Sequence, residues 1–199
     1  MARINHAFLL LAILAAIGFQ SSCQTNPSES ISTVLESTSE PVKEGDVSIK
    51  ISSPAFAEDG TIPKKFTCDA ENLSPALSWS GIPQGAKSLV LIVDDPDAPV
   101  GIFVHWVLYG MTGNLTGLPE GVSKSDTVSG IGIQGINDFR KTGYDGPCPP
   151  KGSTHRYYFK LYALDVALEL KTGAKKAGLE QAMEEHILAQ GQLMGRYGR

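Results

Sequence analysis

The segment Ser88 to Asp94, with the sequence SLVLIVD, limits the possible folds of this chain more than any other stretch. An unbroken run of Leu, Val and Ile follows its first serine. A strand with one face in water alternates apolar and polar residues, whereas an unbroken apolar run is typical of a strand buried on both faces. We therefore expect a sheet with this strand at its centre.

Three further segments are predicted to be strands, and the stretches between them are rich in Pro and Gly. The strands are expected at Val47 to Ile51, where apolar and polar residues alternate, at His105 to Tyr109 and at Tyr157 to Leu164. The Pro- and Gly-rich connections are 72–79, 81–85, 96–101 and 143–152. This spacing of strands and turn-forming stretches predicts a mainly β fold with antiparallel pairing.

One amphipathic helix is predicted near the C-terminus, within Ala177 to Gln190. Its apolar stripe recurs at steps of three and four residues and consists of Leu179, Ala182, Met183, His186 and Ile187. Gly191 is expected to end the helix. His186 is interpreted as a packed or half-exposed helix residue, because it lies on or beside the stripe.

Residues 1–22 are typical of an export signal peptide. Arg3 precedes an apolar run, Ala7 to Ile17, that is too short to span a bilayer as a stable helix. Cys23 follows two serines and resembles the lipid-attachment cysteine of bacterial lipoproteins, although Gln20 stands where that motif prefers an apolar residue. We expect Cys23 to be lipidated, with simple cleavage as the alternative. Either outcome predicts an extracytoplasmic protein of the bacterial envelope, lipid-anchored to a membrane or periplasmic.

Residues 23–46 are predicted to form a flexible tether, and residues 47–199 a single folded domain. The tether is rich in Ser, Thr and Glu, and such a segment cannot bury enough apolar surface to offset its ordering entropy. The chain has a formal charge of −4, most of it on the tether, so the domain is close to neutral. Without a basic excess to displace counterions from phosphates, a nucleic-acid-binding function is excluded.

Polar side chains that are candidates for binding or catalysis lie at the ends of the predicted strands. The turn Asp94 to Pro99 holds three carboxylates, which repel one another unless hydrogen-bonded, so we expect at least one to face an inward partner. His105 opens an apolar strand, a position where a packed core histidine is common. His155 and Tyr157 share one face of a strand, because they are two residues apart. The Gly- and Pro-rich loop before them, 143–152, can present free N–H groups to an anion.

Six motifs occur in the order found in one protein family. They are NLSPALSW (72–79), DPDAP (95–99), HWVLY (105–109), NDF (137–139), GYDGPCPPKG (143–152) and THRYYFKLYALD (154–165). DPDAP alone has little specificity, but the ordered set is specific. The chain thereby resembles the phosphatidylethanolamine-binding protein (PEBP) family, and most closely its bacterial Raf-kinase-inhibitor-like branch of the YbhB/YbcL type.

The resemblance implies a large antiparallel sheet packed on a smaller one, with short helices that include one near the C-terminus. It also implies a small pocket that binds phosphate or phosphoryl head groups. The residues carried over to that pocket are Asp95, Asp97, His105, Gly146, Cys148, His155 and Tyr157. We expect the imidazoles, the phenol and loop N–H groups to donate hydrogen bonds to the oxyanion, while the carboxylates raise the pKa values of the histidines.

The resemblance further implies a binding protein rather than an enzyme, with no cofactor and no metal. The expected partners are a small anion such as phosphate or a phospholipid head group, a membrane through the lipid anchor, and a protein whose activity is modulated. Family members are described as modulators of kinases and serine proteases, so inhibition of a serine protease is an alternative function. Two others are a metal site of two His and two Asp, which lacks HxH or HxxxH spacing, and a Ser-His-Asp hydrolase, which lacks a G-x-S-x-G motif.

The chain has three cysteines. If Cys23 carries a lipid, Cys68 and Cys148 are left as a pair in an oxidising compartment. They are expected either to form a disulfide that closes a long loop or to remain two free buried thiols, and we prefer the disulfide.

Overall fold

The structure is a computed structural model, and it describes residues 48–199. Its elements are β1 (Lys50–Ser52), β2 (Gly60–Thr61), η1 (Lys64–Phe66), β3 (Leu77–Ser80), β4 (Ser88–Asp95), β5 (Phe103–Thr112), β6 (Gly117–Leu118), β7 (Thr127–Val128), β8 (Gly132–Gln134), β9 (Thr154–Leu164), α1 (Lys176–Met183) and β10 (Ile187–Gly198). Strands dominate this part of the chain, which confirms the predicted mainly β fold.

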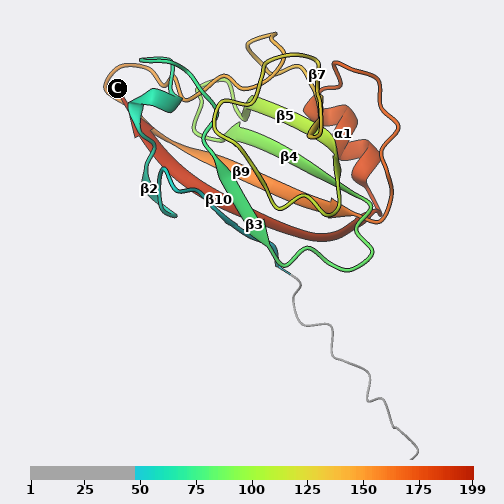
Figure 1. Ribbon diagram of the computed structural model, residues 1–199. Helices are drawn as coiled ribbons and strands as arrows, with labels where there is room; N and C mark the ends of the chain where they lie inside the picture. The colour runs from blue at the N-terminus through green and yellow to red at the C-terminus, as the bar shows by residue number, and fades with distance from the viewer. Residues whose placement is uncertain (1–47) are drawn as a thin grey trace, which may run out of the picture. The chain divides into compact units, whose positions relative to one another are not determined.

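The strands form a seven-stranded sheet and a three-stranded sheet (Figure 1). The strand order is β2-β10-β9-β4-β5-β8-β7 in the larger sheet and β1-β3-β6 in the smaller one. The long neighbouring pairs β10–β9, β9–β4 and β4–β5 are all antiparallel. The short strand β2 pairs with β10 in parallel, so the larger sheet is mixed rather than wholly antiparallel as the resemblance implied.

The central strand β4 is buried over its whole length, as its sequence predicts. Alternate residues of a strand point to opposite faces of the sheet. Leu91 and Val93 lie in a core that includes residues of β3, whereas Val90 and Ile92 lie in a second core that includes residues of α1. The larger sheet is therefore covered by the smaller sheet on one face and by α1 on the other (Figure 1).

The predicted C-terminal helix is correct only in its first half. α1 ends at Met183, and Glu185 follows with a φ of 67°, in the left-handed region. Ile187–Gly198 then form β10, which pairs with β9 along its length. His186 lies in the turn between them, where its Nδ1 is 2.9 Å from Oδ1 of Asp165. Helical spacing in the sequence was overridden by pairing with a strand distant in the chain.

Gly191, which was expected to end the helix, and Gly195 both lie inside β10. A Cβ at Gly191 would stand 1.9 Å from the carbonyl oxygen of Ile49, and a Cβ at Gly195 would stand 2.6 Å from a side-chain carbon of Ile62. In a strand, glycine permits another segment to approach closely. These glycines therefore let the chain around β1 and β2 pack on β10.

The N-terminal predictions concern residues outside the described part of the chain. They are the signal peptide at 1–22, the tether at 23–46 and lipidation of Cys23. Within residues 48–199, the structure contains no helix with the length and apolar character needed to cross a bilayer.

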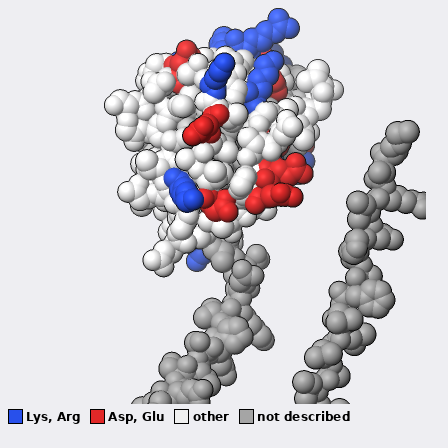
Figure 2. Space-filling view, turned by 90° about the vertical axis from the view of Figure 1, so that its right-hand side faces the viewer, with Lys and Arg blue, Asp and Glu red and all other residues white. Residues whose placement is uncertain are grey.

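Charged side chains of both signs are spread over the face of the domain that carries α1 (Figure 2). Neither sign dominates this face, and some basic groups lie directly beside acidic ones. This distribution agrees with the near-neutral charge calculated for the domain from the sequence.

Candidate functional site

A cavity of about 360 Å³ opens where β4 ends and where β5 and β9 begin. Because these neighbouring strands are antiparallel, the three chain segments meet at the same edge of the sheet. The lining residues are Asp95, Ala98, Pro99, Val100, Phe103, His105, Phe139, Cys148, Pro149, Pro150, His155 and Arg199. Most of these side chains are apolar, and the few polar ones therefore determine which charged group can bind.

Asp95 and His155 form a buried pair in this cavity. The Nδ1 atom of His155 lies 2.8 Å from Oδ2 of Asp95, and the two side chains are only 7% and 4% exposed. Asp95 is the last residue of β4, and His155 is the second residue of β9. The contact sets the orientation of the imidazole and keeps its Nδ1 occupied. On the other side of the ring, Nε2 lies 3.3 Å from Oγ of Ser153.

The other two carboxylates of the turn are paired elsewhere. Asp97 accepts hydrogen bonds from the backbone N–H and the guanidinium of Arg156, which hold the pKa of its carboxyl down at about 2. Asp94 is fully buried on the α1 side of the sheet, with the ammonium groups of Lys160 and Lys176 each 2.9 Å away. All three carboxylates thus face a basic partner, and only Asp95 lines the cavity.

His105 is held as a neutral imidazole. Its Nδ1 lies 2.7 Å from the carbonyl oxygen of Asp145, so this nitrogen donates a hydrogen bond and Nε2 is left as an acceptor in the neutral ring. Burial lowers the pKa of His105 and outweighs the nearby carbonyl and carboxylate groups, which act in the opposite direction. The expectation of a raised pKa is therefore wrong for this histidine, because desolvation is the larger effect.

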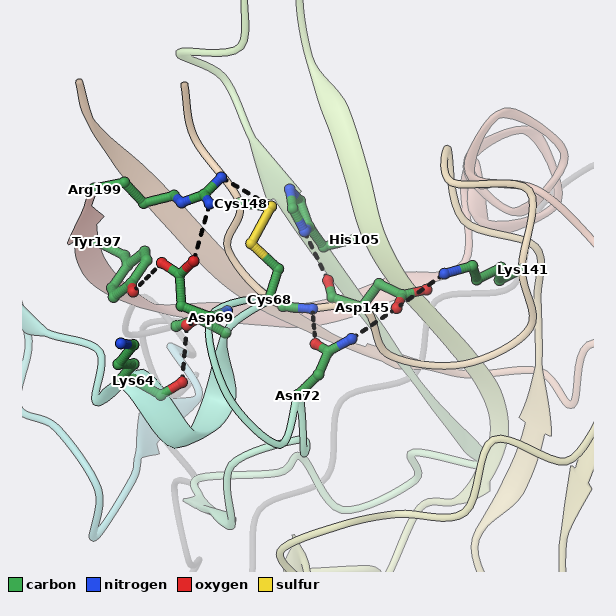
Figure 3. Close-up of a disulfide and its surroundings, with 12 residues drawn as sticks. Lys64, Cys68, Asp69, Asn72, His105, Lys141, Asp145, Cys148, Tyr197 and Arg199 are labelled. Carbon is green, nitrogen blue, oxygen red and sulfur yellow. Dashed lines mark hydrogen bonds and ion pairs between the residues drawn. A yellow bond between two sulfur atoms is a disulfide. The ribbon is translucent and has the colours of Figure 1, made fainter. Parts of the chain in front are cut away.

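The carbonyl group that holds His105 belongs to a residue fixed by a polar network. The buried carboxylate of Asp145 accepts hydrogen bonds from Asn72, at 2.9 Å, and from Asn137, at 3.1 Å. Asn72 also accepts a hydrogen bond from the N–H of Gly146 at 2.7 Å (Figure 3). This network anchors the Gly- and Pro-rich loop beneath the cavity.

Tyr157 is buried beside both histidines. Its ring lies edge-on to His105, with centroids 5.2 Å apart, and is stacked near His155 at 6.5 Å. The hydroxyl is buried and has no hydrogen-bond partner among the described residues. Burial and the charge of Asp95 raise its pKa, so the phenol stays protonated and can donate a hydrogen bond.

A disulfide joins Cys68 to Cys148 at the rim of the cavity (Figure 3). It links positions 80 residues apart in the sequence. The N–H of Cys68 also donates to the carbonyl oxygen of Pro147 at 3.1 Å. Next to Cys68, the carboxylate of Asp69 lies 3.0 Å from the guanidinium of Arg199, so the rim is held by a covalent and an ionic link.

The cavity brings together most of the site residues carried over from the family. Asp95, His105, Cys148 and His155 line it, and Tyr157 packs on both histidines. Three predicted residues do not line it. The carboxylate of Asp97 binds Arg156, the N–H of Gly146 binds Asn72, and Tyr157 lies behind the histidines. The predicted set omitted several residues that do: Ala98, Pro99, Val100, Phe103, Phe139, Pro149, Pro150 and Arg199. Phe139 lies in the NDF motif, whereas nothing in the sequence marks Arg199.

The arrangement of acidic and imidazole groups does not form a metal centre within residues 48–199. No group of three or more His, Cys, Asp or Glu side chains there is placed to hold a metal ion. The polar groups that line the cavity are the carboxylate of Asp95, the imidazoles of His105 and His155, and the guanidinium of Arg199.

The fold and the site define a member of the PEBP family. The family model of the phosphatidylethanolamine-binding protein matches residues 52–198, and the chain belongs to this family. Within it, the chain falls in the branch of the UPF0098 and YbcL proteins.

Relatives and solved structures support this placement. A UPF0098 protein of Methanothermobacter thermautotrophicus is 48% identical over 151 residues, which cover 76% of this chain and 99% of the relative. The crystal structure of the PEBP homologue CT736 from Chlamydia trachomatis is 41% identical and has a TM-score of 0.71, over 77% of this chain and 99% of that chain. E. coli YbcL is 30% identical with a TM-score of 0.70, over 76% and 98% of the two chains.

Proposed function

We propose that the domain binds a small oxyanion, either phosphate or a phosphoryl head group, in the cavity between β4, β5 and β9. The observation that carries this proposal is the cavity lined by His105 and by the buried Asp95–His155 pair, with the hydroxyl of Tyr157 buried behind the two histidines. The family membership of the chain supports the same ligand class.

The apolar walls indicate what is attached to the anionic group. Phe103 and Phe139 pack edge-on with centroids 4.8 Å apart, and Phe103 packs on His105 at 5.4 Å. At the mouth of the cavity, Val100 is 82% exposed. Apolar groups next to a polar floor favour a ligand with an apolar portion beside its charge, such as a phosphoryl group that carries an alkyl or acyl chain.

We favour binding over catalysis, although Ser153, His155 and Asp95 form a hydrogen-bonded series of the type found in serine hydrolases. Two features argue against a hydrolase. The hydroxyl of Ser153 also contacts the carbonyl oxygen of Pro150 at 2.8 Å, closer than the 3.3 Å to His155. The N–H groups of Gly152 and Ser153 are already bonded to Arg199 and Pro150, so they are not free to stabilise an oxyanion intermediate.

Calorimetric titration of the full chain with phosphate and with phosphoethanolamine tests the binding function. We expect saturable binding by the wild type and a Kd at least tenfold weaker for His155→Asn. His186→Asn is the matched control, because His186 also pairs with an aspartate but lies at the surface, with 45% of its side chain exposed. No binding by the wild type, or equal affinity in both variants, contradicts the proposal.

An ester-hydrolysis assay of the wild type and Ser153→Ala tests the alternative. We expect no difference between the two proteins above the buffer rate. A wild-type rate that Ser153→Ala abolishes would establish a hydrolase and overturn the binding-only proposal.

We also propose that the protein is exported and anchored through Cys23, with the anion-binding domain on the outer side of a membrane. The disulfide between Cys68 and Cys148 supports an oxidising compartment. Metabolic labelling with a radioactive fatty acid tests the anchor: we expect label on the wild type and none on Cys23→Ala. Unlabelled wild type recovered without cleavage in the cytoplasmic fraction would contradict both export and anchoring.

A further inference from the structure

We propose that Arg199 supplies the fixed positive charge of the anion pocket and that Asp69 positions it. This inference rests on the proposed function, since it assigns the residue that neutralises the bound anion. Arg199 lies one position beyond residues 52–198, the stretch matched by the family model, so family membership does not assign it this role.

The position of Arg199 follows from the contacts at both ends of the residue. Its N–H donates to the carbonyl oxygen of Ser153 at 3.3 Å, and its own carbonyl oxygen accepts from Gly152 at 2.7 Å. These bonds fix the backbone beside the start of β9. The side chain then lines the same cavity as Asp95, His105 and His155, and it is 27% exposed.

Asp69 fixes the direction of the guanidinium. Its carboxylate contacts Nη2 of Arg199 at 3.0 Å and accepts a hydrogen bond from the hydroxyl of Tyr197 at 2.6 Å (Figure 3). On the other side, Nη1 of Arg199 lies 3.6 Å from Sγ of Cys148. A guanidinium has five N–H donors, so donors remain for a ligand after these contacts are made.

The other groups of the cavity do not supply a permanent positive charge. His105 is buried and its neutral ring presents an acceptor, since Nδ1 donates to Asp145. His155 carries a charge only when its ring is protonated, so its charge is not permanent. Arg199 is therefore the cation that an oxyanion meets in this cavity, and its guanidinium stays charged at every physiological pH.

The test is titration of the full chain with sulfate, which keeps its charge between about pH 5 and pH 8, the range in which histidines titrate. We expect Arg199→Gln to weaken binding at least tenfold at pH 8 and Arg199→Lys to recover part of the loss. Asp69→Asn should weaken binding less than Arg199→Gln, because the cation remains but loses its orientation. Arg196→Gln is the matched control. Arg196 also lies near the end of β10 and forms an ion pair with an aspartate, Asp59, but it does not line the cavity.

Salt and pH separate a charge in the pocket from a structural role. Added salt should weaken wild-type sulfate binding more than the residual binding of Arg199→Gln, since screening acts on the charge. The charge of Arg199 is the same from pH 5 to pH 8, so the loss caused by Arg199→Gln should be present at both ends of this range. Equal affinity and equal salt dependence in wild type and Arg199→Gln would overturn the inference. So would loss of binding with no recovery in a folded Arg199→Lys variant. Absence of sulfate and phosphate binding in the wild type would instead overturn the proposed function.

Discussion

The Nδ1 atom of His155 lies 2.8 Å from Oδ2 of Asp95, and the pair is buried although 60 residues separate its members in the chain. A second pair, His186 and Asp165, has almost the same distance of 2.9 Å but is half exposed, with side chains 45% and 50% accessible. The protein therefore contains two pairs of equal geometry and unequal environment. Any difference between them reports the effect of burial.

We predict that Asp95→Asn lowers the free energy of unfolding by about 1–3 kcal/mol, whereas Asp165→Asn changes it by less than about 1 kcal/mol. The reason is that a buried imidazole left without its full hydrogen-bond acceptor cannot turn to water, while His186 can. Urea unfolding at neutral pH measures both values. Equal losses in the two variants would show that burial does not strengthen the Asp95–His155 contact.

We predict that His105 makes the domain less stable as the pH falls. The unfolded histidine binds a proton near pH 6.5, and burial holds the pKa of native His105 below its ordinary value. Between these two pKa values the unfolded chain binds more protons, so stability is full above about pH 6.5 and is lost at up to about 1.4 kcal/mol per pH unit below it. His105→Gln should remove this part of the slope of unfolding free energy against pH.

His186→Gln serves as the control for the pH experiment, because this histidine is half exposed. The slope of unfolding free energy against pH in His186→Gln should match that of the wild type. If the slope of unfolding free energy against pH is as steep in His105→Gln as in the wild type, groups other than His105 cause the acid sensitivity. The half-buried turn carboxylate Asp97 acts at lower pH, between its native pKa of about 2 and its unfolded pKa of about 3.9.

The central part of the fold was predictable from local sequence, but the C-terminal end was not. The unbroken apolar run of β4 predicts burial on both faces, and this prediction does not depend on knowing the neighbouring strands. β10 is different, because its first residue, Ile187, continues the helical spacing of the preceding apolar stripe and its pairing with β9 is a tertiary effect. Gly191 was interpreted as a helix-ending residue, because its real constraint lies in a segment distant in the sequence.

The site divides in the same way. Asp95, His105 and His155 were found through motifs at strand ends, where side chains from neighbouring strands meet. Arg199 was missed because its place in the cavity depends on backbone bonds to Ser153 and Gly152, which no local pattern reveals. Sequence motifs also gave no indication that Asp97 turns away from the cavity toward Arg156. The direction in which a side chain points depends on the residue that it contacts, and that residue is brought near it only when the chain folds.

We predict opposite effects from two glycine-to-alanine changes. Gly191→Ala should destabilise the domain by about 1–3 kcal/mol, since the new Cβ would press on the backbone of Ile49. Gly178→Ala should stabilise it by up to about 1 kcal/mol, because Gly178 lies in α1 with open space around it and alanine is the better helix former. Thermal unfolding of both variants checks the sign, and a neutral Gly191→Ala would show that β10 and the chain near β1 can separate without cost.

Finally, we predict that the disulfide supports both the stability of the domain and the anion site. Reduction of Cys68–Cys148 frees a loop of 80 residues in the unfolded chain, which should lower the free energy of unfolding by about 2–4 kcal/mol. It should also weaken oxyanion binding, because Asp69 follows Cys68 directly and holds the guanidinium of Arg199. Calorimetric titration with sulfate before and after reduction measures the second effect.

The double variant Cys68→Ser/Cys148→Ser is the control, since it lacks the bridge at any redox potential. Its stability and its sulfate affinity should match those of the reduced wild type, and a reductant should change neither. An effect of reductant on the double variant would point to Cys23, the third cysteine, rather than to the bridge. If reduction lowers stability but leaves the affinity of the folded wild type unchanged, the disulfide is a structural link only. Arg199 would then be positioned by its backbone bonds and by Asp69 alone, without help from the covalent link at the rim.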